Sequence, residues 1–228
     1  MKKIIIISAS VLIGIMGCSE STDKKTTQSE NNSITTEQKR EPTSDNSGSL
    51  NKLNRLLDLY ENTETFPITV STKRKRDSQE FIAAGNEGKG IPQDLLPVFN
   101  SRIEGKPDAQ HTEVYATRRF FVSDSTIGLL TRVPGFYWPS KIMLFVVNTQ
   151  SGNIIAHQEV AENTGDAGES LMLETKINRE SAGNLSMQIS KEQCSPTDDT
   201  LEKSTCVNSV LTYEINSEGI HLIDEQKK

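Results

Sequence analysis

The clearest pattern in this chain is an alternation of apolar and polar residues that begins near residue 113. Leu185, Met187 and Ile189, for example, alternate with serine and glutamine. Because side chains along a strand point to opposite faces in turn, this pattern predicts strands with one buried face and one exposed face. Short polar turns separate the segments. About eight strands are predicted, near residues 114–123, 126–133, 140–148, 153–161, 170–178, 184–191, 205–216 and 219–224.

One of these segments is apolar without interruption. Residues 142–147 contain no polar side chain, which predicts a central strand that is covered on both faces. Consecutive strands joined by short turns build an antiparallel meander. We therefore predict a mainly β fold, an antiparallel meander of about eight strands that is sandwich or barrel-like. Strand spacing does not choose between these two closures and an irregular propeller-like sheet.

A different period precedes the strands. Apolar residues recur at helical spacing near residues 49–60, and Ser49 or Asn51 can cap such a helix. This predicts one short N-terminal helix that packs on the sheet, with a partner-binding helix as the alternative. Prolines and glycines interrupt any periodic pattern in residues 62–112. Within this region, the sequence at 90–96 favours a second short helix. The apolar side of the first helix is formed by Leu50, Leu53, Leu56, Leu57 and Tyr60.

The first 18 residues have a basic start, an apolar stretch and a cysteine. The stretch at 4–15 is too short to span a bilayer, and Gly17 and Cys18 follow it closely. This arrangement resembles the signal peptide of bacterial lipoproteins, although Met16 is larger than the residue usual at its position. The resemblance implies that residues 1–17 are removed and that Cys18 carries diacylglycerol and an N-acyl chain. The alternative is an ordinary signal peptide followed by a free thiol.

The resemblance also implies a location in the bacterial cell envelope, where the lipid holds the protein on a membrane. Ser19 follows the cysteine and favours the outer membrane over the plasma membrane under the sorting rule of double-membraned bacteria. Residues 18–48 are polar and too poor in apolar side chains to form a core, which predicts a flexible tether. A single mainly β domain is predicted for 49–228, with the helix and an irregular lead-in at 49–112 and the sheet at 113–228.

Charge is unevenly distributed. Residues 158–228 contain 14 acidic and 6 basic side chains, whereas the rest of the mature chain is neutral. An acidic region of this size argues against nucleic acid as a partner. It either keeps the domain soluble or attracts a basic ligand. The one basic cluster, at 73–76, is interpreted as a solvated loop or as a group that meets phosphates or this acidic region.

Cys194 and Cys206 are the remaining cysteines. In an exported chain, an even pair separated by a polar loop predicts a disulfide. It would join the strands predicted at 184–191 and 205–216 and stabilise the fold by about 3 kcal/mol in the chain-entropy model. A free pair or a redox site are the alternatives.

No catalytic motif stands out. His111, His157 and His221 lie far apart in the sequence, so no metal site is predicted, and no cofactor other than the lipid is expected. The acidic residues at 198–202 and at 166–169 do not match calcium-loop spacing. Carboxylates brought together by folding leave no sequence motif, so a hydrolase remains the alternative class.

Three adjacent aromatic residues, Phe136, Tyr137 and Trp138, lie between two prolines in a predicted turn. Aromatic rings at a turn either stack on a ligand or a protein partner, or fold back and cap the end of the sheet. With the lipid signal, they favour an envelope binding module, for example an inhibitor or an assembly factor. An envelope hydrolase and a purely structural surface lipoprotein are the alternatives.

Overall fold

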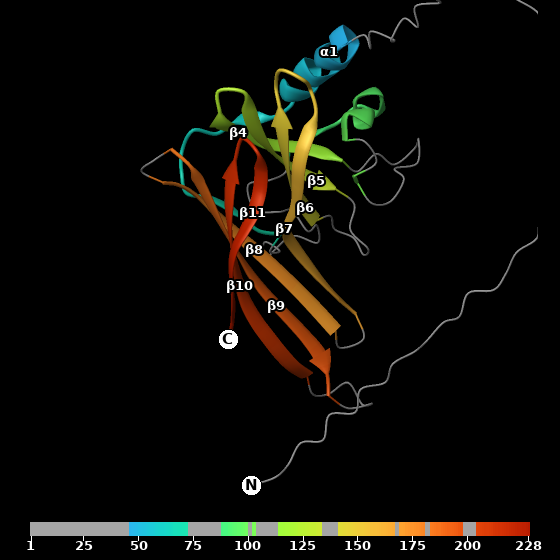
Figure 1. The fold of residues 1–228 in the computed structure, drawn as a ribbon. Helices are drawn as coiled ribbons and strands as arrows, with labels where there is room; N and C mark the ends of the chain where they lie inside the picture. The colour runs from blue at the N-terminus through green and yellow to red at the C-terminus, as the bar shows by residue number, and fades with distance from the viewer. Residues whose placement is uncertain are drawn as a thin grey trace, which may run out of the picture. The chain divides into compact units, whose positions relative to one another are not determined.

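The long strands follow one another in the sheet in the same order as in the sequence (Figure 1). The computed structural model describes residues 46–72, 88–99, 102–103, 114–133, 141–166, 169–180, 183–197 and 204–228. They all belong to the unit Thr43–Lys228. The helices are α1 (Asn46–Leu57) and the 3-10 helix η1 (Gln93–Phe99). The strands are β1 (Glu61–Asn62), β2 (Ile68–Val70), β3 (Lys89–Gly90), β4 (Tyr115–Ser123), β5 (Thr126–Val133), β6 (Lys141–Asn148), β7 (Ile154–Asp166), β8 (Glu169–Arg179), β9 (Leu185–Pro196), β10 (Ser204–Asn216) and β11 (Gly219–Lys227).

The predicted mainly β fold with a short N-terminal helix is confirmed. Each neighbouring pair from β4 to β11 is antiparallel. The strand number and the purely antiparallel arrangement are wrong, because the lead-in adds β1, β2 and β3, and β1 runs parallel to β4. These added strands are two or three residues long, too short to show a period in sequence. In the described residues the sheet is open and mixed, with β1 and β11 at the ends of its hydrogen-bonded order.

Strand β7 connects two parts of the sheet by changing its partner. Its residues 154–161 pair with β6, whereas 162–166 pair with β8. The first part contains β1, β3, β4, β5, β6 and the start of β7. The second part contains the end of β7 and β8 to β11, with β2 beside β8.

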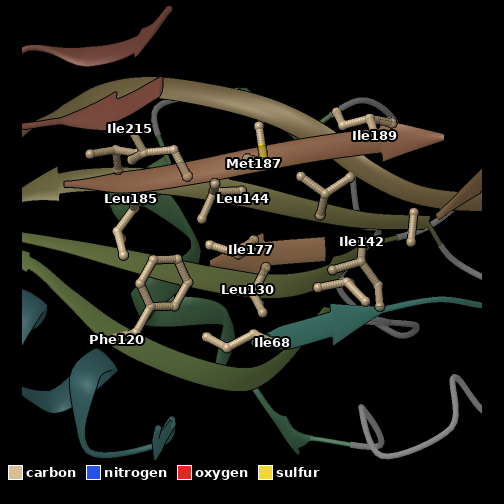
Figure 2. Close-up of a cluster of buried hydrophobic side chains, with 14 of the residues drawn as sticks. Ile68, Phe120, Leu130, Ile142, Leu144, Ile177, Leu185, Met187, Ile189 and Ile215 are labelled. Atoms are coloured by element: carbon tan, nitrogen blue, oxygen red, sulfur yellow. The ribbon is translucent and has the colours of Figure 1, made fainter. Parts of the chain in front are cut away.

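The two parts enclose the larger apolar core (Figure 2). Phe120, Leu130 and Leu144 come from the first part, and their side chains meet those of β2, β8, β9 and β10. The alternation read from 184–191 is confirmed, because Leu185, Met187 and Ile189 are all buried in this core.

A second core lies between the other face of the first part and the two helices. Leu53 and Leu56 of α1 and Leu95 and Phe99 of η1 are buried there against strands β4 to β7. The predicted packing of the first helix on the sheet is confirmed, and α1 begins at Asn46, one turn earlier than predicted. The helix near 90–96 is also confirmed, as η1.

Strand β6 separates the two cores. Ile142, Leu144 and Val146 belong to the larger core, and the residues between them, Met143, Phe145 and Val147, belong to the second. This confirms that the continuous apolar run is a central strand with both faces covered. None of the helices that the structure describes is long and apolar enough to cross a membrane.

Gly128 on β5 gives the ring of Phe120 room to lie over the strand. The two residues are cross-strand partners, and a Cβ added at Gly128 would collide with the Phe120 ring. We expect Gly128→Ala to lower the free energy of unfolding by about 1–3 kcal/mol, because the buried ring has to leave its position. Denaturant unfolding measures this loss.

Gly90→Ala is the matched control, since no atom lies within 4 Å of a Cβ added there. Adding Phe120→Leu to Gly128→Ala should make the two changes less destabilising together than the sum of the single changes. Equal stability of Gly128→Ala and Gly90→Ala would contradict the role given to the ring.

Candidate functional site

The aromatic residues Phe136, Tyr137 and Trp138 lie outside the described residues, but both ends of their turn are described. Val133, the last residue of β5, is the cross-strand partner of Lys141, the first residue of β6. The turn therefore starts and ends at one end of the first part of the sheet.

Polar side chains surround the two ends of this turn. Lys141 Nζ lies 3.0 Å from Glu159 Oε2, and these side chains are only 14% and 23% exposed. The Arg132 guanidinium lies 4.0 Å from the centre of the Tyr115 ring, a cation–π contact. Because these side chains are held by neighbouring strands, they provide a fixed base for the turn.

The same end of the sheet adjoins the place where β7 changes partner. Ile142 pairs with Ala161, and the next residue of β7, Glu162, already pairs with Leu173 of β8. Lys141, the residue before Ile142, therefore lies near the first residues of β7 that belong to the second part of the sheet.

From this place β7, β8, β9 and β10 extend past most of the core residues, although Leu171 on β8 is partly buried and still packs against the larger core. We call this extension the arm, defined as residues 162–166, 169–172, 191–196 and 204–208. Among its described side chains only Cys194 is buried, and all of 204–208 are exposed. In Figure 1 the arm is the end of these strands that lies farthest from α1. The arm is a sheet with two accessible faces.

The predicted disulfide joins two strands of the arm. Cys194 and Cys206 are cross-strand partners on β9 and β10, and their sulfur atoms are 2.08 Å apart. The predicted disulfide is confirmed. It contributes most to stability in this part of the sheet, because strands without a core gain little from hydrophobic burial.

We expect the Cys194→Ser/Cys206→Ser double variant to lose about 3 kcal/mol of unfolding free energy, the value of the chain-entropy model for a loop of this length. Hydrogen exchange should show amide protection falling most in 191–196 and 204–208, while β6 keeps its protection. A uniform loss over the whole domain would show that the arm does not open separately.

A groove of about 240 Å³ crosses the root of the arm. Two cross-strand rows form its floor on β8, β9 and β10. One row is Met172, Glu192 and Asn208, and the other is Glu174, Ser190 and Val210. The short side chain of Ser190, between Glu174 and Val210, explains the depression. Lys191, Ser209 and Lys228 complete the lining.

Glu174 connects this groove to the lead-in of the domain. Ser71 directly follows β2, and its hydroxyl donates a hydrogen bond of 3.0 Å to Glu174 Oε1. The basic cluster at 73–76 follows closely in sequence but lies outside the described residues. The groove therefore brings together two carboxylates, an amide and two apolar side chains from three strands.

A second cavity, of about 360 Å³, lies at the start of α1. It is lined by Ser49 and Lys52 of the helix and by Gly152 and Asn153 of the β6–β7 turn, among others. It is close to the point where the predicted tether joins the domain.

Two titratable groups have shifted pKa values near the surface. Burial, and the positive charge of Arg102, lower the pKa of His157, which stacks on Phe145. Burial, and the negative charge of Glu225, raise the pKa of Tyr213. His111 and the acidic residues 198–202 lie outside the described residues. Within the described ranges, histidine, cysteine and acidic side chains form no group that could hold a metal ion.

Sequence reasoning predicted the arm in part and missed the groove. The strands predicted at 170–178 and 205–216 include residues of the arm, but those predicted at 153–161 and 184–191 stop before most of it, where Asn163, Thr164 and Glu192 are polar. The predicted disulfide was a further signal that the strands continue there. No protein-family model matches the chain, and no curated protein or solved structure matches it either.

Proposed function

We propose that the protein is a lipid-anchored bacterial envelope protein, held on the outer membrane through Cys18, that binds a protein partner or ligand. The binding surface is the arm together with the aromatic turn at 134–140. The lipid requires no membrane-spanning helix, and the polar residues after Cys18 give the domain a reach of about 30 Å from the membrane.

One observation carries the binding proposal: the sheet continues past most of its core residues as an arm in which Cys194 is the one buried side chain among those described, and a disulfide joins two of its strands. Such an extension adds little hydrophobic stabilisation to the domain. It offers edges, side chains and a groove to a partner. Val207, whose side chain is 54% exposed, gives this surface an apolar contact point.

In-cell photocrosslinking tests the proposal. A photoreactive amino acid at Val207 should give one dominant adduct, because the side chain lies on the binding surface. Ile155, 36% exposed on β7 outside the arm, is the matched control position and should give none. No adduct at Val207, or the same adducts at both positions, would contradict binding through the arm and favour a purely structural surface component.

An envelope hydrolase is the second candidate, and the groove favours it, because Glu174 and Glu192 both line it. Paired carboxylates serve as general acid and base in the hydrolysis of glycosidic bonds. If the protein is a hydrolase, the purified full chain should clear peptidoglycan in a zymogram, and Glu174→Gln/Glu192→Gln should abolish the clearing. The binding proposal predicts no clearing by either form.

A further inference from the structure

The charged side chains along the outer edge of β11 are arranged so that two copies of this strand, paired antiparallel, place opposite charges side by side. Within the described residues β11 is the last strand of the hydrogen-bonded order, and no strand pairs with its outer edge. Residues 221–228 are exposed, and Leu222 and Ile223 are 54% and 62% exposed. Such an edge is a template for another strand.

The ladder with β10 determines which backbone groups point outward. The amide of Lys228 donates to the carbonyl of Asn208 at 2.8 Å, so these residues form a hydrogen-bonded pair. Antiparallel ladders alternate hydrogen-bonded and non-hydrogen-bonded pairs. Lys227, opposite Ser209, and Glu225, opposite Leu211, are therefore non-hydrogen-bonded toward β10. Their N–H and C=O groups point to the free edge.

The side chains of this segment alternate between two faces. Glu225 and Lys227 share one face, where their charged atoms are 3.7 Å apart. Asp224 and Gln226 share the other face, where the Gln226 amide donates to the Asp224 carboxylate at 2.8 Å. Each face of the edge thus keeps a fixed set of polar groups.

We propose that β11 is a homodimer interface, in which the edges of two copies pair antiparallel about a two-fold axis at Gln226. This register places Glu225 opposite Lys227 of the second copy, and Asp224 opposite its Lys228. Both pairings join residues of the same sheet face. The outward backbone groups of Glu225 and Lys227 then form the hydrogen-bonded pairs of the new ladder.

The charge order selects a second copy over a different partner. Each ion pair occurs twice, because the two-fold axis exchanges the strands, so two acidic and two basic positions are matched without any other chain. Exposed cross-strand ion pairs contribute only weakly to the free energy of association. The dimer is therefore weak and reversible in dilute solution, and it does not depend on the proposed lipid anchor or on a partner bound at the arm.

A cysteine at the axis tests the register. In the proposed ladder the two copies of Gln226 form a non-hydrogen-bonded pair, with Cα atoms about 4.5 Å apart, a separation that a disulfide bridges. Full-length Gln226→Cys, oxidised in mild detergent, should run as a covalent dimer on a non-reducing gel. Asp224→Cys is the matched control on the same face, because its two copies are about 14 Å apart along the strand. Wild type shows any background from its own cysteines.

A charge exchange tests the ion pairs. In the Gln226→Cys chain, Glu225→Lys or Lys227→Glu alone should lower the dimer yield at least about five-fold, because like charges then face each other twice. The two changes together should restore the yield. Absence of the Gln226→Cys dimer, a yield no higher than that of Asp224→Cys, or no recovery in the exchanged variant would overturn the proposal. The charges would then serve only to protect the edge from pairing.

Discussion

Cys18→Ser is expected to abolish lipid attachment. If the proposed anchor is correct, no thioether to diacylglycerol can form without the thiol, and the cysteine before which the proposed signal is cut is missing. Wild type should incorporate labelled palmitate and have the mass of residues 18–228 plus lipid. The variant should take up no label and should accumulate with residues 1–17 attached. Labelling and intact-mass spectrometry measure both effects.

The other two cysteines provide the control for this experiment. Cys194→Ser/Cys206→Ser removes the disulfide and should leave the label unchanged, because its cysteines lie in the sheet. Label in Cys18→Ser, or unlabelled wild type, would contradict the anchor. The difference between anchored and unanchored protein is large, since each buried CH₂ of the acyl chains contributes about 0.8 kcal/mol.

Phe145→Ala should cause a large loss of stability, about 3–5 kcal/mol of unfolding free energy. Phe145 is fully buried on β6, where its ring lies 4.9 Å from the ring of Phe99 and stacks on His157 at 6.2 Å. Removing the ring leaves a cavity where η1 packs against the sheet. Urea unfolding followed by circular dichroism measures the loss.

Phe121→Ala is the matched control, because Phe121 on β4 is 56% exposed. It should change the free energy of unfolding by well under 1 kcal/mol. Similar losses for both variants would show that the second core is not packed as described.

The strands were predictable where one face is buried. Burial of one or both faces of a strand is visible in the order of its apolar residues. Examples are the alternation of Leu185, Met187 and Ile189 and the unbroken run at 142–147. In the same way, the apolar stripe that includes Leu53 and Leu56 indicates the face of α1 that packs on the sheet. These elements have the predicted type, and β6 has nearly the predicted bounds, whereas β9 continues five residues beyond its predicted end.

Features that depend on distant partners were not predictable. Ser71 and Glu174 are 103 residues apart in sequence, yet a hydrogen bond joins them beside the groove. Gly128 is required only because Phe120 is its cross-strand partner. The ends of β7 and β9 in the arm, at 162–166 and 191–196, are mostly polar and so lack the alternation that marks a strand.

The candidate site was predictable in part. The disulfide of Cys194 and Cys206 follows from composition and export, and the structure confirms it. The aromatic turn was chosen for its residue types alone. Its residues lie outside those described, and the place of its two neighbours, Val133 and Lys141, near the start of the arm depends on β7 changing partner between Ala161 and Glu162, which no local pattern indicates.

The most direct measurement is a comparison of the partners captured from position 138 in the aromatic turn and from position 207 in the arm. Photocrosslinking from each position in cells, followed by mass spectrometry, identifies the adducts, with position 155 as the control. If both surfaces belong to one binding site, positions 138 and 207 capture the same protein and position 155 captures none. Different proteins from the two positions, or no adduct from either, would contradict a single binding surface formed by the arm and the aromatic turn.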